Sequence, residues 1–176
     1  MDRDLPTVVL RTGRLLLRHM TEADAAFMLG LLNDPSWIRF IGDKGVRTIE
    51  AARDYILAGP VDMVRRLGFG FYVVELAETG CPIGVCGIAK RDFLDNVDIG
   101  YAFLPQHWGQ GYAHEAASGV MAHAKHDIGL KRIVATVRPD NAASIKLLEK
   151  LGLRFERTLP PSADTPELQL FAIDIA

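Results

Sequence analysis

The sequence predicts an α/β fold of the α+β kind, a mixed sheet packed against helices, in one domain over residues 1–176. Apolar residues repeat at helical spacing in some segments and alternate at strand spacing in others. These segments follow in the order strand, two or three helices, three strands, helix, strand, helix and two strands. A chain of this length is long enough to bury a hydrophobic core within one domain.

The N-terminal third combines one strand with helices. Residues 8–18 are rich in β-branched residues and leucine and predict a single strand. Thr21, with Asp24 three residues later, predicts the capped start of a helix that ends near residue 33. The other helical segments expected here are 35–41, one that begins at 48 and breaks near Gly59-Pro60, and its continuation to 66.

The rest of the chain predicts a sheet interrupted by two helices. Residues 69–76 and 82–90 flank a turn and predict a hairpin. In residues 96–104, aromatic and β-branched residues alternate with smaller or polar ones, as in a strand. The later elements expected are a helix over 112–128, a strand over 131–138, a helix over 141–151, and strands over 153–159 and 167–175.

Composition excludes several classes of protein. The formal net charge is -2, without the basic excess typical of proteins that bind nucleic acid or an anionic membrane. No apolar run approaches the roughly 20 residues that span a bilayer, and Met1–Pro6 carry no signal-peptide pattern. Cys81 and Cys86 form no CxxC pair, so both are expected as half-buried, reduced thiols. We therefore expect a cytoplasmic protein without nucleic-acid or membrane partners.

A glycine loop between the strand over 96–104 and the next helix is the most informative segment. Gly109 and Gly111 lack a Cβ, so their backbone N–H groups can approach an anion closely. The helix that starts at once adds unpaired donors and a partial positive charge. Strand, glycine loop and helix start together can hold a pyrophosphate.

The loop alone also fits a plain tight turn between strand and helix. Two familiar phosphate loops are excluded, because the chain has no GxxxxGK[ST] motif and no GxGxxG motif followed by an acidic residue about 20 positions on.

Trp108-Gly109-Gln110-Gly111-Tyr112-Ala113 resembles the acetyl-CoA loop, [QR]xxGx[GA], of the GNAT superfamily of N-acetyltransferases, with Trp108 in place of Gln or Arg. Gln106–Gly111 fits in a second register. The form PxxWGxGYAxEA is similar to the RimJ/RimL branch, in which Trp commonly holds that position. The resemblance implies a mixed, mostly antiparallel central sheet, splayed at its fourth strand and flanked by helices.

A second segment, one strand later, carries the same resemblance. It is similar to NxxSxxxxEKxGF, with matches at Asn141, Ser144, Glu149, Lys150 and Gly152. From the residues alone, Asn141 can cap the helix, and a Ser144 hydroxyl at the helix start can donate a proton to a thiolate. Both also fit plain capping or solvent-facing roles, whereas Glu149 and Lys150 fit a solvated helix surface.

The resemblance implies roles for particular residues. The backbone near Ala102 to Leu104 would stabilise the oxyanion formed from the thioester, and Ser144 would protonate the CoA thiolate. The residues assigned to acetyl-CoA binding are Phe103, Leu104, Trp108, Gly109, Gln110, Gly111, Tyr112, Ala113, Asn141 and Ser144.

A general base must accept the proton of the attacking amine. Asp98 is the candidate, because its strand segment resembles the one where histone-acetylating members place a glutamate. An exposed structural carboxylate is the alternative for Asp98, and Glu22 and Glu167 stay open as bases. Tyr101 and Tyr112 are expected to be packing residues.

The implied function is transfer of an acetyl group from acetyl-CoA to a primary amine, by direct attack in a ternary complex and without a metal. The amine would belong to a protein N-terminus or a small molecule, beside helices from Thr21 to Arg66. His123 and His126 fit a helix surface better than a metal site. A non-catalytic acyl-CoA-binding sensor is the alternative, and a nucleotide-binding α/β domain is a third possibility. A homodimer is compatible with this branch, although no residue indicates one.

Overall fold

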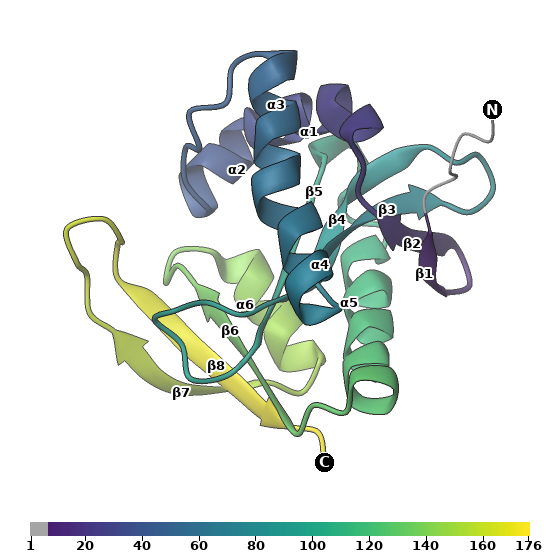
Figure 1. The fold of residues 1–176 in the computed structure, drawn as a ribbon. Helices are drawn as coiled ribbons and strands as arrows, with labels where there is room; N and C mark the ends of the chain where they lie inside the picture. The colour runs from purple at the N-terminus through teal and green to yellow at the C-terminus, as the bar shows by residue number, and fades with distance from the viewer. Residues whose placement is uncertain (1–6) are drawn as a thin grey trace.

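A mixed sheet of eight strands forms the centre of the computed structural model, which describes residues 7–176 (Figure 1). The spatial order is β1-β2-β3-β4-β5-β6-β8-β7, and every neighbouring pair is antiparallel except β5 and β6. The predicted mixed, mostly antiparallel sheet is therefore confirmed. The strands are β1 (Val8–Arg11), β2 (Leu15–His19), β3 (Phe71–Leu76), β4 (Pro82–Ala89), β5 (Asp98–Phe103), β6 (Arg132–Val137), β7 (Arg154–Leu159) and β8 (Leu168–Asp174).

The prediction of one strand over residues 8–18 is wrong, because β1 and β2 form a hairpin there. Its turn is closed locally: the N–H of Thr12 donates to the carbonyl of Leu15 at 2.9 Å, and the N–H of Leu15 donates to the Thr12 hydroxyl at 3.1 Å. Gly13 stands at this turn, and the alternation of apolar and arginine residues on both sides hid it from the sequence pattern. Met1–Pro6 lie outside the described residues.

The N-terminal helices begin as predicted but do not break where predicted. Thr21 caps the chain in a capping box with Asp24, and Thr48 caps α3. Pro60 lies inside the wide π-helical turn η2. Proline has no N–H to donate, and the wider turn accommodates it without ending the helix. The helix therefore continues to Leu67. The helical segments here are η1 (Glu22–Asp24), α1 (Ala25–Leu32), α2 (Pro35–Phe40), α3 (Ile49–Ile56), η2 (Leu57–Val61) and α4 (Asp62–Leu67).

Two helices in the C-terminal half confirm the other helical predictions. Helix α5 (Tyr112–His123) continues through the π-helical turn η4 (Ala124–Ile128), and α6 (Ala142–Lys150) follows β6. None of the helices in residues 7–176 is both long and apolar enough to cross a membrane.

The sheet separates two apolar cores (Figure 1). One face packs against α5 and α6, with the small residues Ala116, Ala117 and Val120 of α5 fully buried. The other face packs against α1, α2 and α3, where Val85 of β4 and Ala102 of β5 belong to the same core. The cysteines are not both half-buried as expected, because Cys86 lies inside β4 and is buried while Cys81 is exposed.

Strands β5 and β6 part almost as soon as they meet. Their ladder is a single bridge between Asp98 and Val134, where the Val134 N–H donates to the Val97 carbonyl at 3.1 Å. On its other side, β5 pairs with β4 from Asp98 to Phe103. The splay expected at the fourth predicted strand is thus present in β5, with its open end toward the glycine loop.

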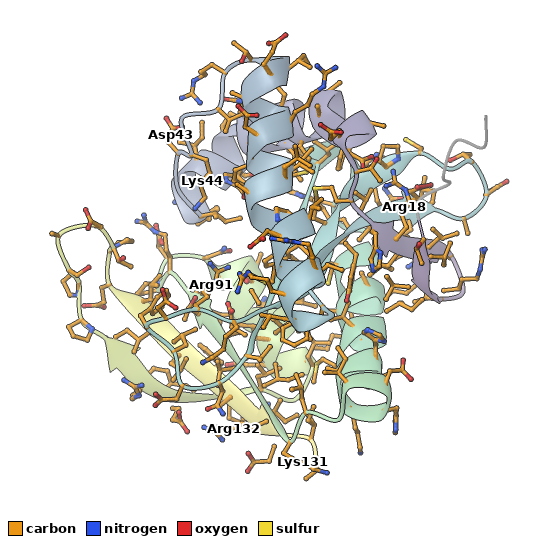
Figure 2. All side chains as sticks on the ribbon, viewed as in Figure 1. Arg18, Asp43, Lys44, Arg91, Lys131 and Arg132 are labelled. Carbon is orange, nitrogen blue, oxygen red and sulfur yellow. The ribbon has the colours of Figure 1, made fainter. Side chains whose placement is uncertain are left out.

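A buried ion cluster links β2, β3 and the first helical turn (Figure 2). Arg18 contacts Asp24 through two nitrogens, at 2.9 and 2.7 Å, and also pairs with Glu75. These hydrogen bonds raise the pKa of the Arg18 guanidinium despite its burial. The cluster fixes the start of the helical layer against the sheet.

Replacing Arg18 by leucine is expected to lower the free energy of unfolding by about 3–5 kcal/mol, because the buried Asp24 and the half-buried Glu75 lose their counter-charge. Urea unfolding at pH 7 measures the change. Arg65→Leu is the control, since this exposed guanidinium bonds only Asp62 on its own helix and its loss should change stability little. A loss below about 1 kcal/mol in Arg18→Leu would contradict the role assigned to the cluster.

Candidate functional site

The chain between β5 and α5 contains two glycines in the left-handed region. Gly109 has a φ of 73° and Gly111 a φ of 82°, and Gly111 is the N-cap residue of α5. This backbone strains any residue with a Cβ, which explains the glycines. The predicted sequence of strand, glycine loop and helix start is confirmed.

The loop leaves a run of backbone donors free. Among residues 7–176, the N–H groups of residues 109–114 donate to no acceptor, and the first bond of the helix runs from the Glu115 N–H to the Gly111 carbonyl at 3.1 Å. These donors lie at the positive end of the α5 dipole. The arrangement can bind a phosphate or pyrophosphate.

Arg14, which the sequence analysis did not identify, braces this loop from the β1–β2 turn. Its Nη1 donates to the Gln110 carbonyl at 2.9 Å, and its Nε pairs with Glu115 Oε2 at 2.7 Å. Its guanidinium carbon lies 4.4 Å from the centroid of the Tyr112 ring. A carboxylate in the first turn of a helix is already favoured by the helix dipole, so Glu115 gave no signal in the sequence that Arg14 is its partner.

Glu115 is the second half of this brace. One oxygen accepts from the Thr12 hydroxyl at 2.6 Å and from the Arg14 N–H at 2.7 Å. Partial burial opposes ionisation, but these bonds and the charge of Arg14 outweigh it and lower the pKa of Glu115. The hairpin and the start of α5 are thereby held together by an ionised carboxylate.

Trp108 fastens the end of β5 to the loop. Its indole Nε1 donates to the Phe103 carbonyl at 2.8 Å, while the side chain stays 54% exposed. An exposed aromatic ring held rigidly beside free backbone donors can stack on a ligand.

The backbone of β5 corrects one expected contact. The Leu104 N–H already donates to the Ile83 carbonyl at 3.0 Å, so it is not available to a thioester. Because the N–H groups of a strand alternate between its two sides, those of Tyr101 and Phe103 point away from β4, toward the side where β6 has parted. The oxyanion donor expected near Ala102 to Leu104 can therefore be Phe103 but not Leu104.

Asn141, Ser144 and Tyr101 form a connected group across the splay. Asn141 Oδ1 accepts from the Ser144 N–H at 3.2 Å, which confirms Asn141 as the N-cap of α6. The Ser144 hydroxyl lies 2.9 Å from the Tyr101 hydroxyl of β5. Burial raises the pKa of Tyr101 to about 12, against the effect of the bond to Ser144. Tyr101 therefore does more than pack, because it keeps its proton at neutral pH and bonds the serine.

Asp98 lies at the closed end of the splay and is only 3% exposed, so it is not an exposed strand carboxylate. Both its oxygens accept from Arg91 Nε, at 3.1 and 3.2 Å. Burial raises the pKa of Asp98, and Arg91 counteracts part of that effect. The other two base candidates, Glu22 and Glu167, are exposed.

His123 departs from the expected helix surface. Its side chain is 14% exposed, its Nδ1 lies 2.7 Å from Asp127 Oδ2, and its ring meets the Tyr72 ring edge-on at 6.2 Å. Among residues 7–176, no group of three or more His, Cys, Asp or Glu side chains is arranged so that it could hold a metal ion.

Comparison with known proteins places this geometry in a family. A model described as an acetyltransferase (GNAT) domain matches residues 14–154. The Bacillus subtilis protein YoaA, named an uncharacterized N-acetyltransferase, is 32% identical over 153 residues, which covers 86% of this chain and 85% of YoaA. Bacillus subtilis YkkB, named an uncharacterized protein, is 31% identical, with 85% and 87% covered.

Solved structures agree with the family model. An acetyltransferase from Agrobacterium tumefaciens superposes with a TM-score of 0.80 at 27% identity, covering 99% of this chain and 98% of that one. RimL, a ribosomal-protein α-N-acetyltransferase solved in complex with coenzyme A, has a TM-score of 0.82 at 19% identity, with 96% and 98% covered. The second likeness concerns the fold alone.

Glu115→Gln is expected to destabilise the protein by about 1 kcal/mol at pH 7, after allowance for screening of the half-exposed Arg14. The pKa of Glu115 is lower in the folded protein than in the unfolded chain. The stability that the ionised Glu115 contributes is therefore fully present above its unfolded pKa, and it is lost as the pH falls through its folded pKa. The stability gap between wild type and variant should therefore shrink between pH 7 and pH 3 in urea unfolding. Glu149→Gln, in an exposed position of α6, is the control, and a gap that does not change with pH would contradict the pairing.

Proposed function

The chain belongs to the GNAT family of acetyltransferases, and we propose that it transfers the acetyl group of acetyl-CoA to a primary amine by direct attack in a ternary complex. The acceptor would be a small molecule or a protein N-terminus. The observation that carries the proposal is the free edge of β5, which leads directly into the loop of free backbone donors. Such an edge can pair with an extended thioester arm whose pyrophosphate lies on the loop.

We assign the binding of acetyl-CoA to the loop and the start of α5. The N–H groups of residues 109–114 would bind the pyrophosphate, with Arg14 keeping the loop in place through Gln110 and Glu115. Two more of the expected binding residues lie nearby: Trp108 stands at the start of this loop, and Asn141 caps α6.

The thioester would lie beside β5. The free N–H of Phe103 would donate to the carbonyl oxygen as negative charge develops there, which lowers the barrier for attack by the amine. The amine must arrive neutral, and Asp98 is the proposed acceptor of its proton, directly or through water. Burial raises the pKa of Asp98 toward the range that suits a general base, and Arg91 opposes part of that shift.

The departing thiolate needs a proton. We assign this step to the Ser144 hydroxyl, which would donate its proton to sulfur as the C–S bond breaks and be reprotonated from water, to which Asp98 would release the proton of the amine. Tyr101 would supply a hydrogen bond to the Ser144 oxygen at that moment, because its own proton is retained at neutral pH. A non-catalytic acyl-CoA-binding protein would need neither Asp98 nor Ser144, so turnover separates the two functions.

Gly109→Ala is expected to weaken acetyl-CoA binding about tenfold, because a left-handed backbone costs a residue with a Cβ roughly 1–2 kcal/mol. The added Cβ meets no atom within 4 Å, so the effect is one of backbone geometry. Gly129→Ala is a matched control, with a φ of 83° and equal space at the far end of α5. Calorimetric titration measures both variants, and equal affinities would remove the loop from the binding site.

Ser144→Ala and Asp98→Asn should bind acetyl-CoA normally and lose turnover by about 10²–10⁴-fold, the usual contribution of a general acid or base. Thiol release with a panel of amines and N-terminal peptides gives the rates, and calorimetry gives the donor affinity. Ser118→Ala, exposed on α5, is the control for Ser144. Undiminished turnover in either variant removes the role proposed for that residue.

A further inference from the structure

Two cations from different connections lie on the side of the sheet that carries α1–α3: Arg91, which bonds Asp98, and Lys44. Arg91 belongs to the connection between β4 and β5, and Lys44 to the connection between α2 and α3 (Figure 2). The charge of Arg91 acts on Lys44 and on Tyr55 of α3, so both of these residues lie within its electrostatic reach. We call Lys44 and Arg91 the Lys44–Arg91 pair.

Arg91 is anchored with part of its guanidinium unused. Its Nε bonds both oxygens of the buried Asp98, at 3.1 and 3.2 Å, while its two Nη groups contact no acceptor among residues 7–176. The side chain remains 41% exposed. A guanidinium fixed through Nε presents its Nη groups in the geometry that matches an oxyanion.

Lys44 adds a second positive charge without a carboxylate of its own. In the part of the chain that the structure describes, it forms no ion pair, and the adjacent Asp43 is paired with Arg47 at 2.6 Å instead. Lys44 is exposed by its accessible surface, yet desolvation by the surrounding protein and the charge of Arg91 both lower its pKa. Among residues 7–176, Asp98 is the carboxylate that pairs with either cation, and a bound anion would offset the repulsion between Lys44 and Arg91.

The Lys44–Arg91 pair lies on the side of the sheet expected to receive the acceptor. Asp98 shares a face of β5 with Gly100 and Ala102, and Ala102 packs in the core under α1 and α3. Tyr101, which meets Ser144, points to the opposite face. The ring of Phe71 covers Gly100, 3.0 Å from where a Cβ would stand, and provides an apolar wall on the face of β5 that carries Asp98.

We propose that the Lys44–Arg91 pair binds an oxyanionic group of the acceptor, so that the substrate is a small amine that also carries a carboxylate or a phosphate. This inference rests on the proposed acetyl transfer. The anion would lie on the Arg91 Nη groups and Lys44, the carbon chain along Phe71, and the amine toward the open side of β5. An amine without an anionic group would leave Lys44 and the free Nη groups of Arg91 without an acceptor.

The test compares matched acceptors in the thiol-release assay. Each free amino acid is paired with its carboxamide, and each aminoalkyl phosphate with its aminoalcohol, so that the members of a pair differ mainly in the anion. Wild type should prefer the anionic member at least about tenfold in kcat/KM, the value of one charge-assisted contact. The larger of the two preferences identifies carboxylate or phosphate as the anion.

Lys44→Gln should reduce that preference about tenfold through KM for the acceptor, with KM for acetyl-CoA unchanged. Lys125→Gln, an exposed lysine at the end of α5, is the matched control and should keep the wild-type preference. Equal rates for charged and uncharged acceptors, or a preference that Lys44→Gln leaves intact, would overturn the inference while acetyl transfer stands.

A binding measurement keeps the two proposals separable. The same pairs are titrated by calorimetry into the CoA-bound protein, where anionic members should bind more tightly and Lys44→Gln should remove the difference. If no amine is acetylated although acetyl-CoA binds, the proposed function fails, and this titration alone decides on the anion site. Absence of any difference between charged and uncharged members then overturns the site as well.

Discussion

The separation of β5 from β6 is the constraint on which the rest of the structure depends. A sheet normally pairs every inner strand on both sides, and here the pairing stops after one bridge at Asp98. The polar backbone that follows is left for water or a ligand. The fold maintains this opening because β4 pairs along the whole of β5 and because Trp108 ties the end of that strand to the loop.

Some of the side chains around the opening serve more than one role. Asp98 is the candidate base, yet it also orients Arg91, so an anion bound by Arg91 would weaken the pull of that cation on the carboxylate. Tyr101 and Ser144 connect β5 to α6 across the parted strands and so join the two halves of the sheet near the proposed thiolate. Arg14 and Glu115 act only through the loop they support.

Sequence patterns predicted the parts of this arrangement that depend on local chemistry. Glycines at positive φ, an asparagine N-cap and apolar periodicity each leave a local signature, so the loop, the α6 start and most elements were expected. Contacts between distant segments have no such signature. Four features depend on pairing between distant segments: the β1–β2 turn, the partner of Glu115, the bond between Tyr101 and Ser144, and the Ile83 carbonyl that accepts from the Leu104 N–H. At Pro60, the wide helical turn overcame the usual tendency of proline to end a helix.

The two cores on opposite faces of the sheet have an evolutionary consequence. The loop and α6, with the residues proposed to handle acetyl-CoA, are supported from the α5 side, whereas Tyr55 of α3 and Lys44 of the α2–α3 connection belong to the helical layer on the other face. Substitutions in that layer can therefore diversify what is recognised while the chemistry beneath stays intact. A duplicated copy of such a chain could acquire a new metabolic niche by changing one layer alone.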